Sequence, residues 1–198
     1  MIIYRFPRSR SLKVLWTLEE LGVAYDSVKV DLLTANKNSE SPHPFGKVPY
    51  LVDEDISISE TLAICIFICE KYSGESLYPS APLEKSLVNT WISFAITDLE
   101  SCVWGLLKQI FFKPEDKRNS AIVNDLRDEV YKVITQIKID PRKKWIASDT
   151  FSLADIFMSQ TLQWAKYCGI ELDEPINTYL EKTINRRSYQ IASERNDA

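Results

Sequence analysis

Apolar and polar positions alternate in two different rhythms along the first 75 residues, and these rhythms predict short strands separated by helices. Short apolar or alternating runs predict four strands, at residues 2–6, 25–30, 48–52 and 56–58. Apolar residues at helical spacing predict two helices, at residues 12–21 and from about 61 to 72. Gly22 follows the first helix and is a plausible C-cap.

The connections between these elements favour a mixed sheet. The first two predicted strands flank a helix, which favours a parallel pair. The acidic turn at 53–55 predicts a tight hairpin, and the polar, proline-flanked residues 34–44 predict a loop or an irregular helix. The order β-α-β-loop-β-β-α is the thioredoxin-like order, so we expect residues 1–76 to form a thioredoxin-like α/β domain.

The rest of the chain has almost no strand pattern and predicts an all-helical bundle domain over residues 83–198. Two prolines fall within residues 77–82, a composition typical of a linker. The first helix expected in this domain covers residues 83–112. Its apolar stripe is wide enough to predict burial on two sides. Ser152 and Asp155 form a capping-box pattern. The expected helices cover residues 83–112, 116–137, 153–167, 175–184 and 189–195.

Composition and charge exclude several classes of protein. The 198 residues are 45% apolar and 26% charged, which is typical of a globular chain. The net charge of −4 argues against a nucleic-acid partner. The longest apolar run, 62–69, is far short of the roughly 20 residues that a membrane helix needs. The first residues lack a signal-peptide layout, so we expect a cytoplasmic protein with no membrane partner.

Metal and classical nucleophile chemistry have few candidate residues. The four cysteines form no Cys-x-x-Cys pair, and Cys65 and Cys69 share the face of an apolar helix. The single histidine, His43, lies between two prolines. We therefore expect no metal site, and a Ser-His-Asp or Cys-His mechanism would have to use His43.

The turn after the first strand is the first candidate for chemistry. A helix N-terminus presents free backbone N–H groups and a partial positive charge. Thioredoxin-like folds place reactive sulfur chemistry at this turn, but here the turn holds Ser9 and Ser11 instead of cysteine. A serine hydroxyl can donate a hydrogen bond to a thiolate supplied by another molecule. Alternatively, the two serines only cap the helix.

Two further segments are candidates for binding. Pro49 opens a predicted strand, and a cis Val48–Pro49 bond would turn the Val48 backbone outward to pair with an extended ligand. A trans proline at a sheet edge is the more common arrangement. Ser59, Glu60 and Thr61 begin a helix and could form a nest for a carboxylate, or simply cap the helix.

Taken together and in order, these segments resemble the glutathione S-transferase family over nearly the whole chain. SRSLKVLWTLEE at 9–20 looks like the family's first helix, and PFGKVP at 44–49 is similar to its Asn-Pro-Phe-Gly-Lys-Val-Pro stretch. ISETLAI at 58–64 resembles its Glu-Ser-x-Ala-Ile segment. FSLADI at 151–156 resembles the capping box of its helical domain.

The resemblance implies a glutathione transferase that stabilises the glutathione thiolate and conjugates it to small hydrophobic electrophiles. Ser9 is the expected catalytic serine and Ser11 the second choice; Arg10 stands where cysteine-type members have their cysteine. The expected glutathione-binding residues are Lys47, Val48, Pro49, Glu60 and Thr61. His43 replaces the family's asparagine.

The electrophile site is expected between the two domains, near Asp98, Cys102 and Trp104 on the long helix. Asp98 is expected to be either a buried, satisfied polar group or a ligand contact. The width of the apolar stripe and the resemblance both predict a homodimer. Two other functions remain open: a scaffold protein of the same fold with little transferase activity, and glutathione-dependent reduction of peroxides or disulfides.

Overall fold

The computed structural model describes residues 1–32 and 41–198, and by its internal contacts the chain divides into two compact units. The first unit consists of Met1–Ser80 together with Asn185–Ala198, and the second of Ala81–Ile184. The predicted boundary near residues 77–82 falls at this division. The last 14 residues were expected in the helical domain, but they group with the first unit instead. Residues 34–40 of the predicted loop lie outside the described residues.

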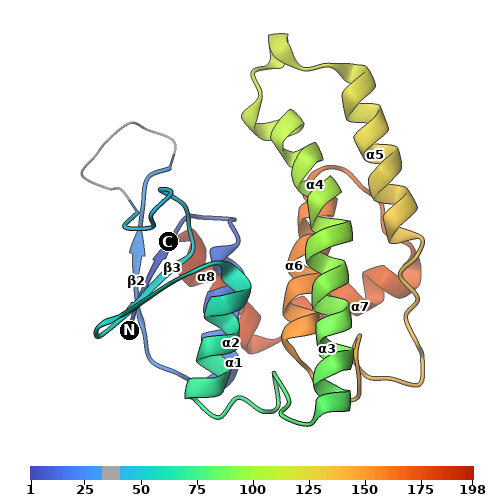
Figure 1. Ribbon diagram of the computed structural model, residues 1–198. Helices are drawn as coiled ribbons and strands as arrows, with labels where there is room; N and C mark the ends of the chain where they lie inside the picture. The colour runs from blue at the N-terminus through green and yellow to red at the C-terminus, as the bar shows by residue number, and fades with distance from the viewer. Residues whose placement is uncertain (33–40) are drawn as a thin grey trace. The chain divides into compact units, whose positions relative to one another are not determined.

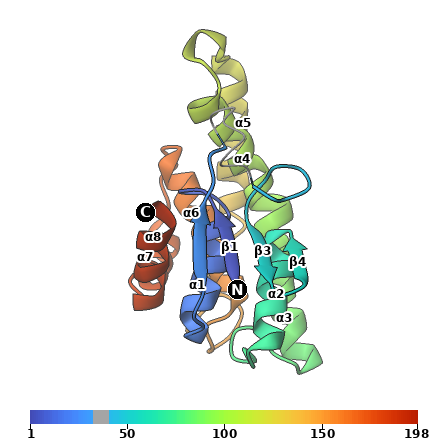
Figure 2. The same cartoon turned by 90° about the vertical axis from the view of Figure 1, so that its left-hand side faces the viewer.

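The first unit is built on a four-stranded mixed sheet with the order β2-β1-β3-β4 (Figure 2). Its strands are β1 (Ile2–Arg5), β2 (Asp26–Lys29), β3 (Tyr50–Asp53) and β4 (Ile56–Ser59). The β1–β2 pair is parallel, and the β1–β3 and β3–β4 pairs are antiparallel, as the sequence predicts. The thioredoxin-like order of the N-terminal domain is therefore confirmed.

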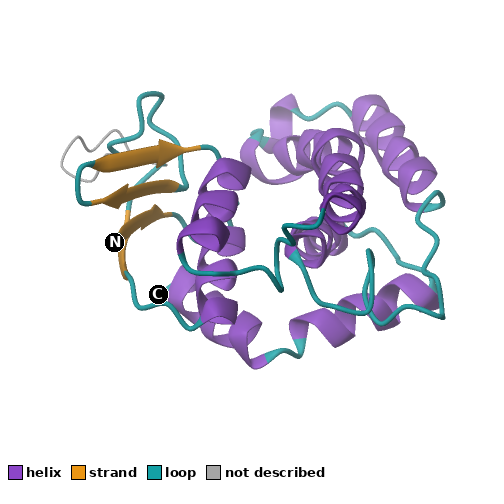
Figure 3. Ribbon diagram, turned by 60° about the horizontal axis from the view of Figure 1, so that its bottom comes forward, coloured by secondary structure: helices purple, strands orange, loops and turns teal. Residues whose placement is uncertain are grey.

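Helices cover one face of this sheet (Figure 3). Ile3 and Leu51 are opposite each other in the β1–β3 pair and are fully buried. Helices α1 (Ser11–Leu21) and α2 (Thr61–Lys71) pack against each other and against strands of the sheet. Gly22 ends α1 with a φ of 65°, the left-handed conformation that glycine adopts at little cost.

The C-terminal helix α8 (Arg187–Asp197) packs along α1 within the first unit (Figure 1). The ring of Trp16 on α1 meets the ring of Tyr189 edge to face, with 4.8 Å between centroids. The guanidinium of Arg5 donates to the backbone carbonyl of Asn196 over 2.8 Å. These contacts attach α8 both to α1 and to the end of β1, the two elements that flank the turn at residues 6–10.

A cluster of hydrogen bonds around Glu20 fixes the chain segment that leads into α8. The Glu20 carboxylate accepts two hydrogen bonds from the guanidinium of Arg186, at 2.7 and 2.6 Å, and one from the indole of Trp16 at 2.9 Å. It also accepts a hydrogen bond from the Ser188 hydroxyl. Burial raises the pKa of Glu20, but the bonds from these three donors outweigh it, and the pKa lies below its usual range.

The second unit is helical throughout its regular structure. A continuous helical stretch from residue 82 to 112 consists of α3 (Pro82–Phe94), a π-helical segment (Ala95–Leu99), α4 (Glu100–Leu107) and a second π-helical segment (Lys108–Phe112). A short 3-10 turn (Glu115–Lys117) precedes α5 (Ser120–Ile134), and α6 (Leu153–Tyr167) and α7 (Glu174–Ile184) complete the unit. The single long helix expected over 83–112 is present, with two π-helical interruptions.

Helix α6 runs through the core of the second unit and begins with the predicted capping box. The Asp155 carboxylate accepts hydrogen bonds from the Ser152 backbone at 2.9 Å, from the Ile146 backbone and from the Tyr179 hydroxyl. Burial raises the pKa of Asp155, against the opposing effect of these hydrogen bonds. The capping pair therefore joins α6 to α7 and to the preceding loop.

Candidate functional site

Three segments leave the sheet of the first unit at the same end. In the strand register, Tyr4 of β1 is opposite Tyr50 of β3, and Tyr50 is opposite Ser59 of β4. The chain after β1, the chain before β3 and the chain after β4 must therefore emerge side by side (Figure 2). These are the three segments that the sequence singled out, at residues 6–11, 47–49 and 60–61.

The turn after β1 gives its two serines different environments. The Ser9 side chain is half-buried, whereas Ser11 is fully buried. The Ser9 hydroxyl oxygen accepts the N–H of Ser11 over 3.1 Å. Ser9 therefore caps the first turn of α1, and of the two side chains only that of Ser9 is partly exposed.

The first turn of α1 uses its own N–H groups internally. Besides the Ser11–Ser9 bond, the N–H of Leu12 reaches the Ser9 carbonyl at 3.2 Å, and the N–H of Lys13 reaches the Arg10 carbonyl at 3.1 Å. An anion bound at this turn would therefore be stabilised by the helix dipole, but it would not accept hydrogen bonds from these three N–H groups. Its direct hydrogen bond would come from another group.

Val48 stands just outside the sheet. The ladder pairs of β3 begin at Tyr50, so the N–H and C=O of Val48 are not used in the ladder. Val48 is half-buried and Pro49 is buried, and the peptide bond between them is cis, the less common of the two alternatives. The Val48 backbone is therefore free of the sheet for pairing with an extended ligand.

The loop before Val48 holds His43, the residue that replaces an asparagine in the resemblance described above. His43 is buried, and its Nδ1 accepts the N–H of Phe45 over 3.0 Å. An asparagine at such a position accepts the N–H two residues further along with its side-chain oxygen, in an Asx-turn. His43 supplies the same hydrogen bond from a ring nitrogen, and its ring also packs against Tyr50, 5.6 Å between centroids.

Lys47 and the residues that open α2 can recognise charged groups. The Lys47 side chain is exposed, with its Nζ 5.8 Å from the centre of the Phe45 ring. Glu60 has a φ of 69°, a conformation that non-glycine residues adopt at a cost and that is frequent at binding sites. Thr61 is 9% exposed, and among the described residues its hydroxyl has no hydrogen-bond partner. A ligand carboxylate at the start of α2 would supply that partner.

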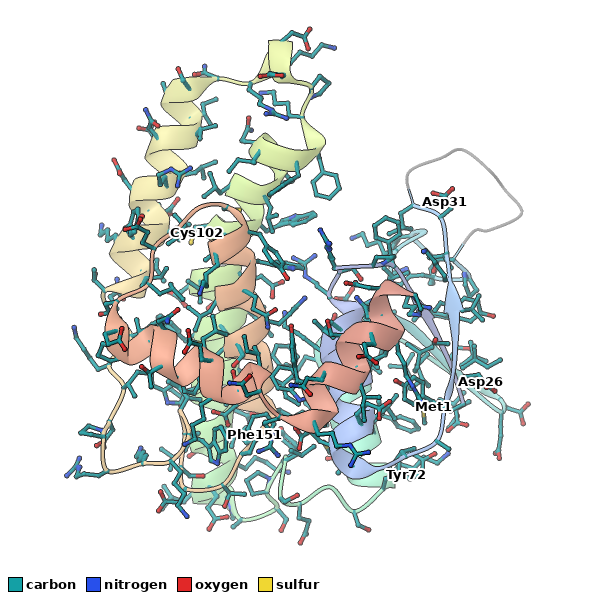
Figure 4. The ribbon with its side chains drawn as sticks, turned by 180° about the vertical axis from the view of Figure 1, so that it is seen from behind. Met1, Asp26, Asp31, Tyr72, Cys102 and Phe151 are labelled. Carbon is teal, nitrogen blue, oxygen red and sulfur yellow. The ribbon has the colours of Figure 1, made fainter. Side chains whose placement is uncertain are left out.

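The three residues expected near the electrophile lie in the second unit and differ in their surroundings. Asp98 is exposed and accepts a hydrogen bond from Thr97 at 2.6 Å, so of its two expected roles that of a buried polar group is wrong. Cys102 is buried on α4 (Figure 4), and its thiol donates to the Leu99 carbonyl at 3.1 Å. Burial raises the pKa of this thiol. The Trp104 ring instead packs against Trp164 of α6. Their role toward an electrophile stays a prediction.

Other chemistry finds little support in the described part of the chain. No group of three or more histidine, cysteine, aspartate or glutamate side chains there is placed to hold a metal ion. All four cysteines are free and buried. None of the helices described is both long enough and apolar enough to cross a membrane.

Comparisons with known proteins agree with the fold. The profile of the glutathione S-transferase N-terminal domain matches residues 1–70. Glutathione S-transferase 3 of Zea mays is 30% identical over 162 residues, which cover 77% of this chain and 72% of that protein. Glutathione S-transferase F10 of Arabidopsis thaliana is 29% identical over 164 residues, which cover 79% of this chain and 76% of that protein. The structure of a sphingomonad glutathione S-transferase complexed with glutathione has the same fold, with a TM-score of 0.84. It is 24% identical in sequence, and the match covers 99% of this chain and 98% of that chain. The chain therefore belongs to the glutathione S-transferase family.

Proposed function

We propose that this glutathione transferase holds the glutathione sulfur as a thiolate through the Ser9 hydroxyl and couples it to small hydrophobic electrophiles. The observation that carries the proposal is the strand register, in which Tyr4, Tyr50 and Ser59 are opposite one another on neighbouring strands. This register brings the Ser9 turn, Val48 and the start of α2 to one end of the sheet. The sphingomonad relative is described as complexed with glutathione, which supports the same ligand here.

Each part of glutathione has a matching group in the first unit. The free N–H and C=O of Val48 pair with the cysteinyl backbone, next to the cis Pro49. The N-terminus of α2 and the Thr61 hydroxyl receive the γ-glutamyl carboxylate, and Glu60 accepts its ammonium group. Lys47, which is exposed, reaches the glycyl carboxylate. This division leaves the sulfur for the Ser9 turn.

The energy required at the sulfur is modest. A free thiol has a pKa of about 8.5, and lowering it to about 6.5 takes roughly 2.7 kcal/mol of preferential stabilisation of the thiolate. One hydrogen bond to a charged group contributes about 1.5–3 kcal/mol. The Ser9 hydroxyl together with the dipole of α1 is therefore sufficient, without a basic side chain.

In the reaction, Ser9 donates a hydrogen bond and does not remove a proton. The thiol proton leaves to solvent when the thiolate forms. The sulfur electron pair then forms a bond to the electrophilic carbon. In a substitution, the leaving group departs with the electrons of the broken bond. In an addition to a double bond, the displaced π-electron pair takes up a proton from solvent. The protein lowers the barrier by raising the fraction of thiolate at neutral pH.

The assignment of the start of α2 is tested by removing the Thr61 hydroxyl. In titration calorimetry, Thr61→Val should bind glutathione roughly tenfold more weakly, because one hydrogen bond to a charged group is lost. Thr61→Ser keeps the hydroxyl and should bind like the unsubstituted protein. Equal affinities for all three proteins would contradict the assignment. Conjugation of glutathione to a generic aryl halide by the unsubstituted protein tests the transferase activity itself.

We also propose a homodimer in the cytosol. Leu83 and Leu87 lie one turn apart on α3 and are 73% and 40% exposed, which leaves an apolar strip for a second copy. Four free cysteines suit a reducing compartment. Sedimentation at micromolar concentration should give the mass of two chains, and the mass of one chain would contradict the proposal.

A further inference from the structure

The two serines at the start of α1 form a pair of hydroxyls that share one hydrogen bond. Their oxygens, Ser9 Oγ and Ser11 Oγ, are 2.9 Å apart. Ser11 is fully buried, and within the described residues Ser9 is the hydrogen-bond partner of its side chain. Ser11 therefore cannot touch a ligand, but the orientation of its hydroxyl is coupled to that of Ser9.

Counting protons shows how this hydrogen bond can run when Ser9 donates to a thiolate. Each serine hydroxyl has one proton to donate and can accept two hydrogen bonds. In the structure the two hydroxyl oxygens lie within hydrogen-bond distance, and the Ser9 oxygen accepts the Ser11 N–H. If Ser9 turns its proton toward a sulfur atom, Ser9 can no longer donate to Ser11. The Ser11 proton can then point back to Ser9.

We propose that Ser11 is a positioning residue, which donates its buried hydroxyl proton to Ser9 Oγ while Ser9 donates to the glutathione sulfur. This inference rests on the proposed role of Ser9. Ser9 Oγ then accepts two hydrogen bonds, from the N–H and from the hydroxyl of Ser11, so its proton is directed away from the helix. Two donors on one oxygen also polarise its O–H group and strengthen the bond that it makes.

The structure separates this role from helix capping. The side-chain acceptor at the first turn is Ser9, because it takes the N–H of Ser11. In Ser11→Ala that backbone N–H remains, and alanine is a good helix former, so the variant should fold. Its expected defect lies in the orientation and polarity of the Ser9 hydroxyl.

The test is a double-mutant cycle with Ser9→Ala, Ser11→Ala and the double variant, with kcat/KM measured as a function of pH. Ser11→Ala should lower kcat/KM about fivefold at pH values where free glutathione is protonated, which corresponds to about 1 kcal/mol for one hydrogen bond. The loss should shrink as pH rises. The double variant should match Ser9→Ala, because Ser11 acts only through Ser9.

A matched control is Thr17→Val, which removes another buried hydroxyl from the same helix, one that donates to the Lys13 carbonyl at 2.8 Å. Its pH profile should be that of the unsubstituted protein. A normal profile for Ser11→Ala, losses that multiply in the double variant, or an equal shift in Thr17→Val would overturn the inference while leaving Ser9 in its role. A normal profile for Ser9→Ala would overturn the proposed function itself.

Discussion

Ser9→Ala is expected to lower the rate of conjugation roughly ten- to a hundredfold near pH 6.5, where a free thiol of pKa about 8.5 is almost fully protonated. The loss follows from the removal of the one side-chain hydroxyl at this turn that a ligand can reach. The rate should recover partly as pH rises, because glutathione then ionises without help. The measurement is the pH dependence of kcat/KM with an aryl halide.

Two accompanying measurements show whether the defect is at the sulfur. Glutathione affinity should change little in Ser9→Ala, since the contacts of Val48 and Thr61 remain. The thermal midpoint should fall modestly, because the N–H of Ser11 loses its acceptor, at a cost of about 1 kcal/mol. If kcat/KM keeps its pH profile, Arg10 or the backbone holds the thiolate and Ser9 is only a cap.

Arg186→Met is expected to lower the free energy of unfolding by about 2–3 kcal/mol at pH 7. The substitution keeps most of the side-chain volume but removes both guanidinium bonds to Glu20, whose side chain is 7% exposed. The carboxylate would keep Trp16 and Ser188 as donors but lose its charged partner. Chemical denaturation at several pH values measures the effect.

The pH dependence of this loss has a definite sign. The pKa of Glu20 is lowered in the folded protein, so its stabilisation is present above the unfolded pKa of about 4.3 and is lost as pH falls through the folded pKa. The difference between Arg186→Met and the unsubstituted protein should therefore shrink in acid. Arg186→Met combined with Glu20→Gln should recover part of the stability, because no unpaired carboxylate remains. A difference that stays constant down to pH 3 would be incompatible with this explanation.

The parts of the fold that the sequence predicted depend on local patterns. The strand order, the capping box of α6 and the end of α1 at Gly22 follow from residues that are close in the chain. The strand β2 was predicted, but its exposure was not: Val28 is 41% exposed in this edge strand. Burial there depends on the neighbours, which the local alternation does not specify.

The two π-helical segments of the long helix were not predicted from the sequence. The prediction assumed 3.6 residues per turn throughout 83–112, whereas hydrogen bonds from i to i+5 within 95–99 and 108–112 add an extra residue to the turn. Every later side chain is rotated relative to the earlier ones. Asp98 lies within the first of these segments and is exposed.

The candidate site was predicted in outline, but the difference between its two serines was not. Both Ser9 and Ser11 precede a helix, and only the path of the turn decides which side chain is buried. The cluster at Glu20 was also missed, because Arg186 lies 166 residues further along the chain and no local pattern links the two. Pairs this far apart become visible only once the fold is known.

The most direct test is an ultraviolet titration of the thiolate of glutathione bound to the unsubstituted protein. If Ser9 and the N-terminus of α1 hold the anion, the bound thiol should titrate near pH 6.5, about two units below the free thiol. The same titration with Ser9→Ala should move back toward the free value by one to two units, as an order of magnitude. A bound thiol that titrates at about 8.5 in the unsubstituted protein would contradict the proposed mechanism.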